Sequence, residues 1–279
     1  MARLILMRGG GDLASGAVMR LARAGLRVVV AEVAEPLAVR RTVSFASAVF
    51  TGAIRVEEIE ARLANTPRQA LDLLDQALVP VLVDPDLDSF RALDPLVLID
   101  GRMLKRPPET AKDIASLVVG LGPGFIAGEN CHAVVETRRG PVLGRVVWSG
   151  PAEADTGLPD PVGEHTADRV LRAPQDGRLV IQAAIGDILE PGSPIAEVAG
   201  TAVRAPFKGV LRGIMQPGLR VTRGQKIGDL DPRCDPRLVQ FVSDKALAVG
   251  GGVLEAVLAR PEIRQSLWDG HPRRGADQR

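Results

Sequence analysis

A run of glycines near the start of the chain has the spacing of a phosphate-binding turn. Gly9, Gly11 and Ala14 match the pattern G-x-G-x-x-G/A, and an acidic residue follows 23 residues after Gly9. Glycines let the backbone turn tightly and let a pyrophosphate approach the amides at a helix start, while the acid would bind a ribose. We therefore predict a nucleotide or dinucleotide site at Gly9, Gly10, Gly11, Asp12 and Glu32.

Two other interpretations of this turn stay open. Asp12 stands where a diphosphate would meet only amides, so its carboxylate could cap the helix or repel the ligand. The turn could also belong to a domain that binds no nucleotide. If the turn is occupied, the expected cofactor is NAD(P) or another nucleotide.

Charged residues and further glycines follow several apolar runs. Asp100 and Arg102 come after residues 95–99, and Glu136 and Arg138 come after residues 133–135. Parallel strands place ligand-binding groups beyond their carboxyl ends. The predicted anion or substrate residues are therefore Arg40, Arg41, Asp100, Arg102, Gly122, Gly124, Glu136 and Arg138. Solvated helix residues remain the alternative for the arginine pair, and an ordinary tight turn for the glycines.

Soft metal ligands are few in this sequence. Cys131, His132 and His165 show no spacing typical of a metal site, so we expect no bound metal. Two cysteines cannot form a disulfide framework, which favours a cytoplasmic location. The net charge of +1 and the lack of a long apolar run predict neither nucleic acid nor a membrane as partner.

The elements that must position the glycine turn alternate between strand and helix. Residues 4–7 predict a buried strand, residues 15–24 an amphipathic helix and residues 26–30 a second strand. This order is the βαβ unit of a dinucleotide-binding fold. We expect a Rossmann-like α/β region with a parallel sheet over residues 1–150, either as one domain or as halves 1–85 and 86–150.

An internal repeat follows a turn-rich linker, residues 151–169. Eleven positions from Arg172 to Val198 recur in identical or similar form at a constant offset of 32. Each copy is too short to bury a face alone, so residues 170–233 predict a duplicated all-β domain. Its pattern is similar to the barrel-sandwich fold of lipoyl and biotinyl carriers. Residues 198–204 join the copies without a lysine, so we expect no lipoate or biotin attachment.

Residues 234–262 predict a C-terminal segment that packs back on the body, with helical apolar spacing from Ser243 to Ala259, and residues 263–279 predict a flexible tail. Ser243 has the residue type and position of the helix N-cap. Three consecutive glycines, Gly250 to Gly252, lie inside this helix at a cost of about 1 kcal/mol each relative to alanine. Such a cost suggests close backbone packing or the approach of a ligand.

Five segments together, residues 8–16, 36–50, 120–125, 134–145 and 243–258, resemble the YqeB family. The resemblance implies an accessory role in the selenium-dependent molybdenum hydroxylase system, in the maturation of xanthine dehydrogenase-like enzymes. It also implies, as partners, a molybdenum hydroxylase or its cofactor-assembly proteins. The resemblance carries a role and no reaction mechanism.

Three functions fit these observations. The first is a maturation factor that binds a nucleotide-type ligand, such as a dinucleotide or the nucleotide form of the molybdenum cofactor, at the glycine turn. The second is an NAD(P)-dependent oxidoreductase, although no residue stands out as a proton donor or nucleophile. The third is a docking protein without a nucleotide. Whether the chain forms a homo-oligomer is left open.

Overall fold

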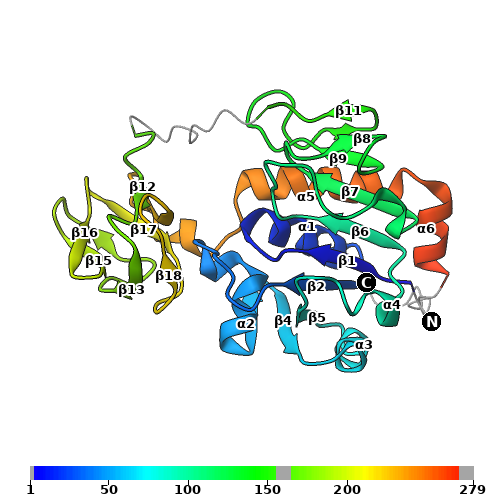
Figure 1. Cartoon of the computed structure of the whole chain (residues 1–279), viewed down its shortest axis with the longest axis horizontal. Coiled ribbons are helices and arrows are strands. Elements are labelled where there is room, and N and C mark those ends of the chain that lie inside the picture. Colours follow the sequence, from blue (N-terminus) through cyan, green and yellow to red (C-terminus); the bar gives the residue numbers. More distant parts are fainter. Residues whose placement is uncertain (1–2, 155–164, 270–279) are drawn as a thin grey trace, which may run out of the picture.

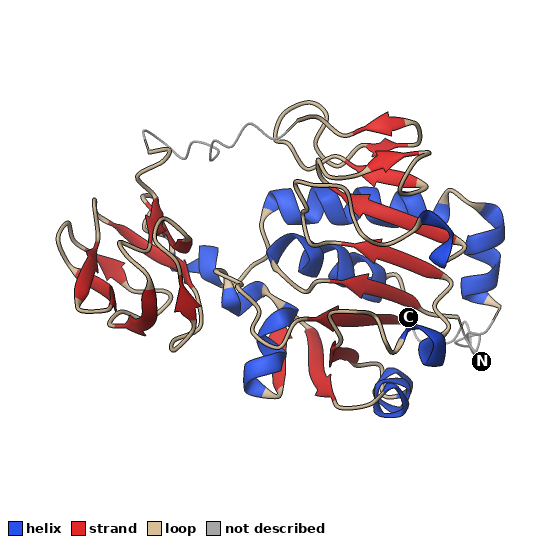
Figure 2. Cartoon of the chain, in the orientation of Figure 1, coloured by secondary structure: helices blue, strands red, loops and turns tan. Residues whose placement is uncertain are grey.

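The structure, a computed structural model, describes residues 3–154 and 165–269. An α/β body occupies most of the molecule, and a smaller β domain lies at one end of it (Figures 1 and 2). The body contains strands β1 (Ile5–Arg8), β2 (Val28–Glu32), β3 (Ala53–Val56), β4 (Ile59–Ala64), β5 (Val79–Val83), β6 (Val97–Asp100), β7 (Leu117–Leu121), β8 (Ile126–Ala127), β9 (Ala133–Val135), β10 (Val146–Val147) and β11 (Gly150–Pro151). Its helices are α1 (Asp12–Arg23), α2 (Ala48–Thr51), α3 (Pro67–Asp75), α4 (Phe90–Leu93), α5 (Asp244–Leu258) and α6 (Pro261–Trp268), with 3-10 turns η1 (Arg41–Val43), η2 (Phe45–Ser47) and η3 (Lys112–Ile114).

Nine strands form the main sheet, in the order β10-β9-β7-β6-β1-β2-β5-β4-β3. The strands from β9 to β4 run parallel, whereas β10 and β3 pair antiparallel at the two edges. Successive residues of β1 face opposite sides of the sheet: Ile5 and Met7 pack with α1 and α5, and Leu6 packs with α3. Both faces are therefore covered, which explains why these strands are continuously apolar.

Helices α1 and α5 pack unusually close together, because glycines remove the side chains between them. A Cβ on Gly16 would lie 2.4 Å from the carbonyl oxygen of Ala246, and one on Gly250 would lie 2.5 Å from the carbonyl oxygen of Gly16. Gly252 in turn packs on the backbone of Gly144. Two of the three consecutive glycines in α5 are thus required for close packing. The third, Gly251, has no described atom near its missing side chain.

The β domain contains strands β12 (Val170–Arg172), β13 (Gly177–Ile181), β14 (Ile188–Leu189), β15 (Pro194–Val198), β16 (Thr201–Arg204), β17 (Gly209–Ile214), β18 (Arg220–Val221) and β19 (Lys226–Asp231). They form two antiparallel sheets of four strands, β12-β19-β17-β14 and β16-β15-β13-β18, around one apolar cluster. Each sheet takes strands from both copies of the sequence repeat. A 3-10 turn, η4 (Pro236–Val239), leads from this domain to α5.

The fold class predicted from the sequence is contradicted. It specified a Rossmann-like parallel sheet with a duplicated lipoyl- or biotinyl-carrier-like barrel-sandwich. The structure instead has one mixed nine-stranded sheet, a two-stranded sheet β11-β8, and the two antiparallel sheets of the β domain. The reason is that the prediction followed continuous apolar runs, whereas the antiparallel edges are short, partly exposed strands that pair with a neighbour in the chain, β3 with β4 and β10 with β9.

Of the predictions for the linker and the C-terminal part, some are confirmed and others are wrong. The helix expected to begin at Ser243 is confirmed, since α5 starts at Asp244 and the Ser243 side chain accepts a hydrogen bond from the Ala246 amide. Residues 263–268, expected as tail, continue α6, and Leu267 is buried. Most of the expected linker, residues 155–164, and tail residues 270–279 lie outside the described residues. No helix in the described ranges is long and apolar enough to cross a bilayer.

The helix packing predicts opposite effects for two neighbouring glycines. Gly250→Ala places a methyl group against the Gly16 carbonyl, so we expect it to lower the free energy of unfolding by about 1–3 kcal/mol. Gly251→Ala meets open space and should raise that free energy by up to about 1 kcal/mol. Urea denaturation midpoints of the two variants measure the difference. Equal shifts in the same direction would contradict this description of the helix interface.

Candidate functional site

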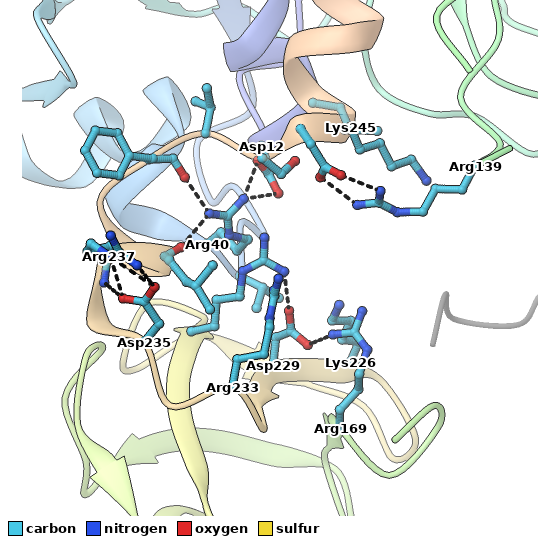
Figure 3. A pocket seen from close by; sticks show the side chains of 18 residues that line it. Asp12, Arg40, Arg139, Arg169, Lys226, Asp229, Arg233, Asp235, Arg237 and Lys245 are labelled. Carbon is cyan, nitrogen blue, oxygen red and sulfur yellow. Dashed lines mark hydrogen bonds and ion pairs between the residues drawn. The ribbon is translucent and has the colours of Figure 1, made fainter. Parts of the chain in front are cut away.

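A basic cleft of about 990 Å³ lies between the α/β body and the β domain (Figure 3). Eight of its lining side chains are basic and four are acidic, which gives the described wall an excess of positive charge. The charged lining residues are Asp12, Arg40, Arg139, Arg169, Arg212, Lys226, Asp229, Arg233, Asp235, Arg237, Asp244 and Lys245. Such a cleft favours an anionic ligand.

On the body side, the cleft is bounded by the starts of two helices. Helix α1 begins at Asp12 and α5 begins at Asp244, and both residues line the cleft. Gly16 of α1 contacts both Ala246 and Gly250 of α5, so the two helices lie against each other with their N-termini at the same end. The positive ends of both helix dipoles therefore add to the positive charge of the lining side chains.

The Arg40 side chain connects the start of α1 with η4 and the segment between η4 and α5. Its buried guanidinium donates to both carboxylate oxygens of Asp12 at 3.0 and 2.9 Å, and to the carbonyl oxygens of Leu238 and Phe241 at 2.9 Å. The neighbouring Arg41 reaches the β domain, where it donates to the carbonyl oxygen of Ile214 at 2.7 Å. The arginine pair that was predicted to bind anions thus holds the body, the cleft wall and the β domain together.

Strand β19, on the β-domain side of the cleft, carries two buried carboxylates, each with a close arginine partner. Asp229 pairs with Arg169, and Asp231 accepts two hydrogen bonds from the side chain of Arg233, at 2.9 and 2.6 Å. The hydrogen bonds from Arg233 lower the pKa of Asp231, against the effect of its burial, which acts to raise it. Both carboxylates therefore have their main partners already.

Arg212, on β17, is left without such a partner. The side chain is only 12% exposed, and its closest carboxylate oxygens are 3.6 Å away on Asp229 and 4.0 Å away on Asp231, beyond hydrogen-bond distance. Its Nε has no partner within residues 3–154 and 165–269. Burial and the nearby Arg40 lower the pKa of Arg212. A largely buried guanidinium with unused donors is costly unless something else binds it.

Lys226, at the start of β19, lies beside Arg212 in the cleft lining. Within the described ranges its ammonium group takes part in no hydrogen bond or close ion pair, although Asp229 attracts it electrostatically. Lys226 is exposed, but the protein atoms around it remove part of its hydration and lower its pKa, and the charges of Arg169 and Arg212 act in the same direction. An anion in the cleft would relieve this repulsion.

The predicted glycine turn lies next to the cleft, where it leads into α1. The Gly10 amide already donates to Glu32 Oε2 at 2.7 Å, and the other oxygen of Glu32 accepts from the Val33 amide. Glu32 therefore closes the turn in this structure. Gly11 is different, because a Cβ there would have no described atom within 4 Å and its φ is an ordinary −68°. The glycine at position 11 is not required by packing.

Asp100 and Arg102 lie at the end of β6, beside the turn. Arg102 donates to both oxygens of Asp100 and to Glu109, and Arg8 also contacts Glu109 at 3.1 Å. A Cβ on Gly9 would lie 3.3 Å from the Arg102 side chain, so this cluster covers the Gly9 end of the turn. The two predicted residues are brought together with the glycine turn, but as an ion-paired cluster.

The remaining predicted residues lie elsewhere along the sheet edge. Glu136 is buried and accepts hydrogen bonds from the amides of Thr137, Arg138 and Glu153, while the Arg138 side chain pairs with Glu153. A Cβ on Gly124 would clash with the Leu104 and Arg106 carbonyls, and one on Gly122 would contact Met103 and Thr137. None of the four lines the basic cleft.

Sequence reasoning missed Arg212, Lys226 and the other basic residues contributed by the β domain. A signal for them exists within the repeat. At the offset of 32, Arg212 corresponds to Val180, and Lys226 corresponds to Pro194. The second copy thus carries charged residues at two positions where the first copy has uncharged ones. Such a difference indicates that these positions have different neighbours in the two copies. In the described part of the chain, no group of histidine, cysteine, aspartate and glutamate residues is arranged to hold a metal ion.

Comparison with curated proteins finds 44% identity over 256 residues to the uncharacterized protein YqeB of Escherichia coli strain K12. The chain is a relative of YqeB. The match covers 92% of this chain and supports the family resemblance seen in its motifs. The chain spans about half the length of this relative, 47%. No family model matches the chain.

Comparison with solved structures finds distant likenesses. The ectoine utilization protein EutE (DoeB) from Ruegeria pomeroyi, in its apo form, is 11% identical with a TM-score of 0.25, covering 82% of this chain and 86% of that one. An aspartoacylase family protein from Mesorhizobium loti is 9% identical, also with a TM-score of 0.25, covering 82% of this chain and 85% of that one. At these TM-scores, the similarity assigns neither a fold nor an activity to this chain.

The ion-paired cluster beside the turn predicts a pH-dependent effect. The hydrogen bond from Arg102 lowers the pKa of Glu109 to about 2, so this carboxylate stabilises the fold above its unfolded pKa and loses that effect as pH falls toward 2. Because Glu109 is exposed, Glu109→Gln should lower the free energy of unfolding by at most about 1 kcal/mol at pH 7. Urea denaturation of both proteins should show this difference shrinking between about pH 5 and pH 3. A difference that grows on acidification would contradict the assignment.

Proposed function

We propose that this chain is an accessory protein for molybdenum hydroxylases that binds a phosphate-bearing, nucleotide-type ligand in the basic cleft. The role, including its place in a selenium-dependent system, rests on the resemblance of the motifs to the YqeB family, and the identity to YqeB supports that family resemblance. The proposed partners are a hydroxylase or the proteins that assemble its cofactor. The candidate ligands are NAD(P), another nucleotide and the nucleotide form of the molybdenum cofactor.

The observation that carries the proposed binding function is the state of Arg212. Its guanidinium lies largely buried in the cleft wall, while the nearby carboxylates of Asp229 and Asp231 have closer partners. A phosphate group presents oxygen acceptors that match a guanidinium in charge and geometry. A diphosphate fits the donor set here, because Lys226 stands beside Arg212 and Gly11 leaves room next to the start of α1.

A ligand panel tests this proposal by thermal shift and titration calorimetry with NAD, NADP, ATP and CTP. At least one should raise Tm, since a ligand at 100 times its Kd adds about 2.7 kcal/mol of stability. Arg212→Met should weaken its binding about tenfold to a hundredfold, because a hydrogen bond to a charged group contributes about 1.5–3 kcal/mol. The free protein should keep its stability, since Asp229 and Asp231 retain Arg169 and Arg233.

Two further variants serve as controls for the panel. Arg220→Met removes an exposed positive charge from β18, outside the cleft, and should leave binding unchanged. Gly11→Val adds a side chain where no other atom lies within 4 Å, so it should weaken ligand binding only if a phosphate approaches the start of α1. If no nucleotide shifts Tm, the ligand-binding proposal fails and the docking function gains support. Turnover of NADH or NADPH would favour the oxidoreductase instead.

The accessory role has its own test in cells. In a host that carries this gene together with a molybdenum hydroxylase, deletion of the gene should lower hydroxylase activity. Wild-type chain and Arg220→Met should restore the activity, and Arg212→Met should not, because only the last removes a cleft residue. The hydroxylase assay in cell extracts measures this, with immunoblots to verify equal amounts of each variant. Full activity in the deletion strain would contradict the role.

A further inference from the structure

One aromatic residue, Phe241, is among the residues that line the cleft. Phe241 is 54% exposed, whereas the other five phenylalanines of the chain are buried or half-buried. Single exposed apolar residues are common on protein surfaces. This one is unusual because it lies in a lining dominated by charged groups. An exposed ring leaves apolar surface in contact with water, although Leu13, Val39 and Val242 also line this cleft.

The segment that carries Phe241 is held firmly from both sides. Arg40 binds the carbonyl oxygens of Leu238 and Phe241, and Thr42 donates to the carbonyl oxygen of Val239. The next amide, that of Val242, donates to Glu57 at 3.1 Å. The backbone of Phe241 is therefore fixed at the cleft while its ring stays exposed. A rigidly supported ring can stack on a planar ligand at little entropic cost.

We propose that the cleft binds a ligand with both a diphosphate and a planar ring, of the nucleoside diphosphate class. Arg212 and Lys226 bind the phosphates, and the ring of Phe241 stacks on the base. This inference rests on the proposed function and narrows its ligand. The cleft volume of about 990 Å³ is large enough for such a molecule. Stacking tolerates any base, so Phe241 contributes affinity and the remaining contacts set which base is preferred.

Titration calorimetry of the full chain with ADP, CDP and inorganic pyrophosphate tests the inference. We expect at least one nucleotide to bind about tenfold more tightly than pyrophosphate, because stacking on an aromatic side chain adds this much or more. Phe241→Ala and Phe241→Leu should remove that advantage and leave pyrophosphate binding unchanged. The leucine variant keeps an apolar side chain, so it separates stacking from simple burial of the site. Arg212→Met should weaken all three ligands.

The outcomes separate this inference from the proposed function. Equal binding of nucleotide and pyrophosphate, unaffected by Phe241→Ala, overturns the stacking role but leaves an anion-binding cleft. Loss of pyrophosphate binding together with nucleotide binding in both phenylalanine variants also overturns it, because the ring would then shape the cleft and not contact a base. If none of the three ligands binds, the inference and the proposed phosphate site both fail.

Discussion

The geometry of the cleft depends on one buried guanidinium, that of Arg40. It neutralises Asp12 at the start of α1 and binds two carbonyl oxygens in the segment before α5. Without it, a carboxylate would stand at the mouth of the cleft and oppose an anion. With it, the negative charge is compensated and the segment that carries Phe241 is fixed. A buried ion pair of this kind contributes more to a defined arrangement than to net stability.

The close packing of α1 and α5 is the second constraint. Gly16 and Gly250 let the two backbones touch, which aligns the helix starts at the same cleft. Segments more than 230 residues apart in the sequence, Asp12 and Ser243, thereby contribute to one wall. The cost of placing glycines inside a helix is offset by contacts that no larger residue would permit.

The β domain contributes the other wall through differences between its two copies. Asp229 keeps the acidic type of its counterpart Glu197, whereas Arg212 and Lys226 replace an uncharged valine and proline. Asp229 and Asp231 allow a cluster of positive charges to exist there, because each binds its own arginine and screens its neighbours. An anion in the cleft would interact with the guanidinium of Arg212. Burial makes this interaction stronger than it would be in open solvent.

The sequence by itself determined the local features of this protein. These are the glycine turn before α1, the N-cap at Ser243, the apolar strands that end at Asp100 and Val135, and the repeat within the β domain, because each depends on residues near one another in the chain. Only the tertiary structure decided the mixed direction of the large sheet and the way strands of both copies share each antiparallel sheet. It also decided that Arg40 and Arg41 hold elements together while Arg212 faces the cleft. The shared sheets of the β domain and the arginine contacts depend on pairings between residues far apart in the chain. The type of a residue does not reveal whether a distant carboxylate already has a partner.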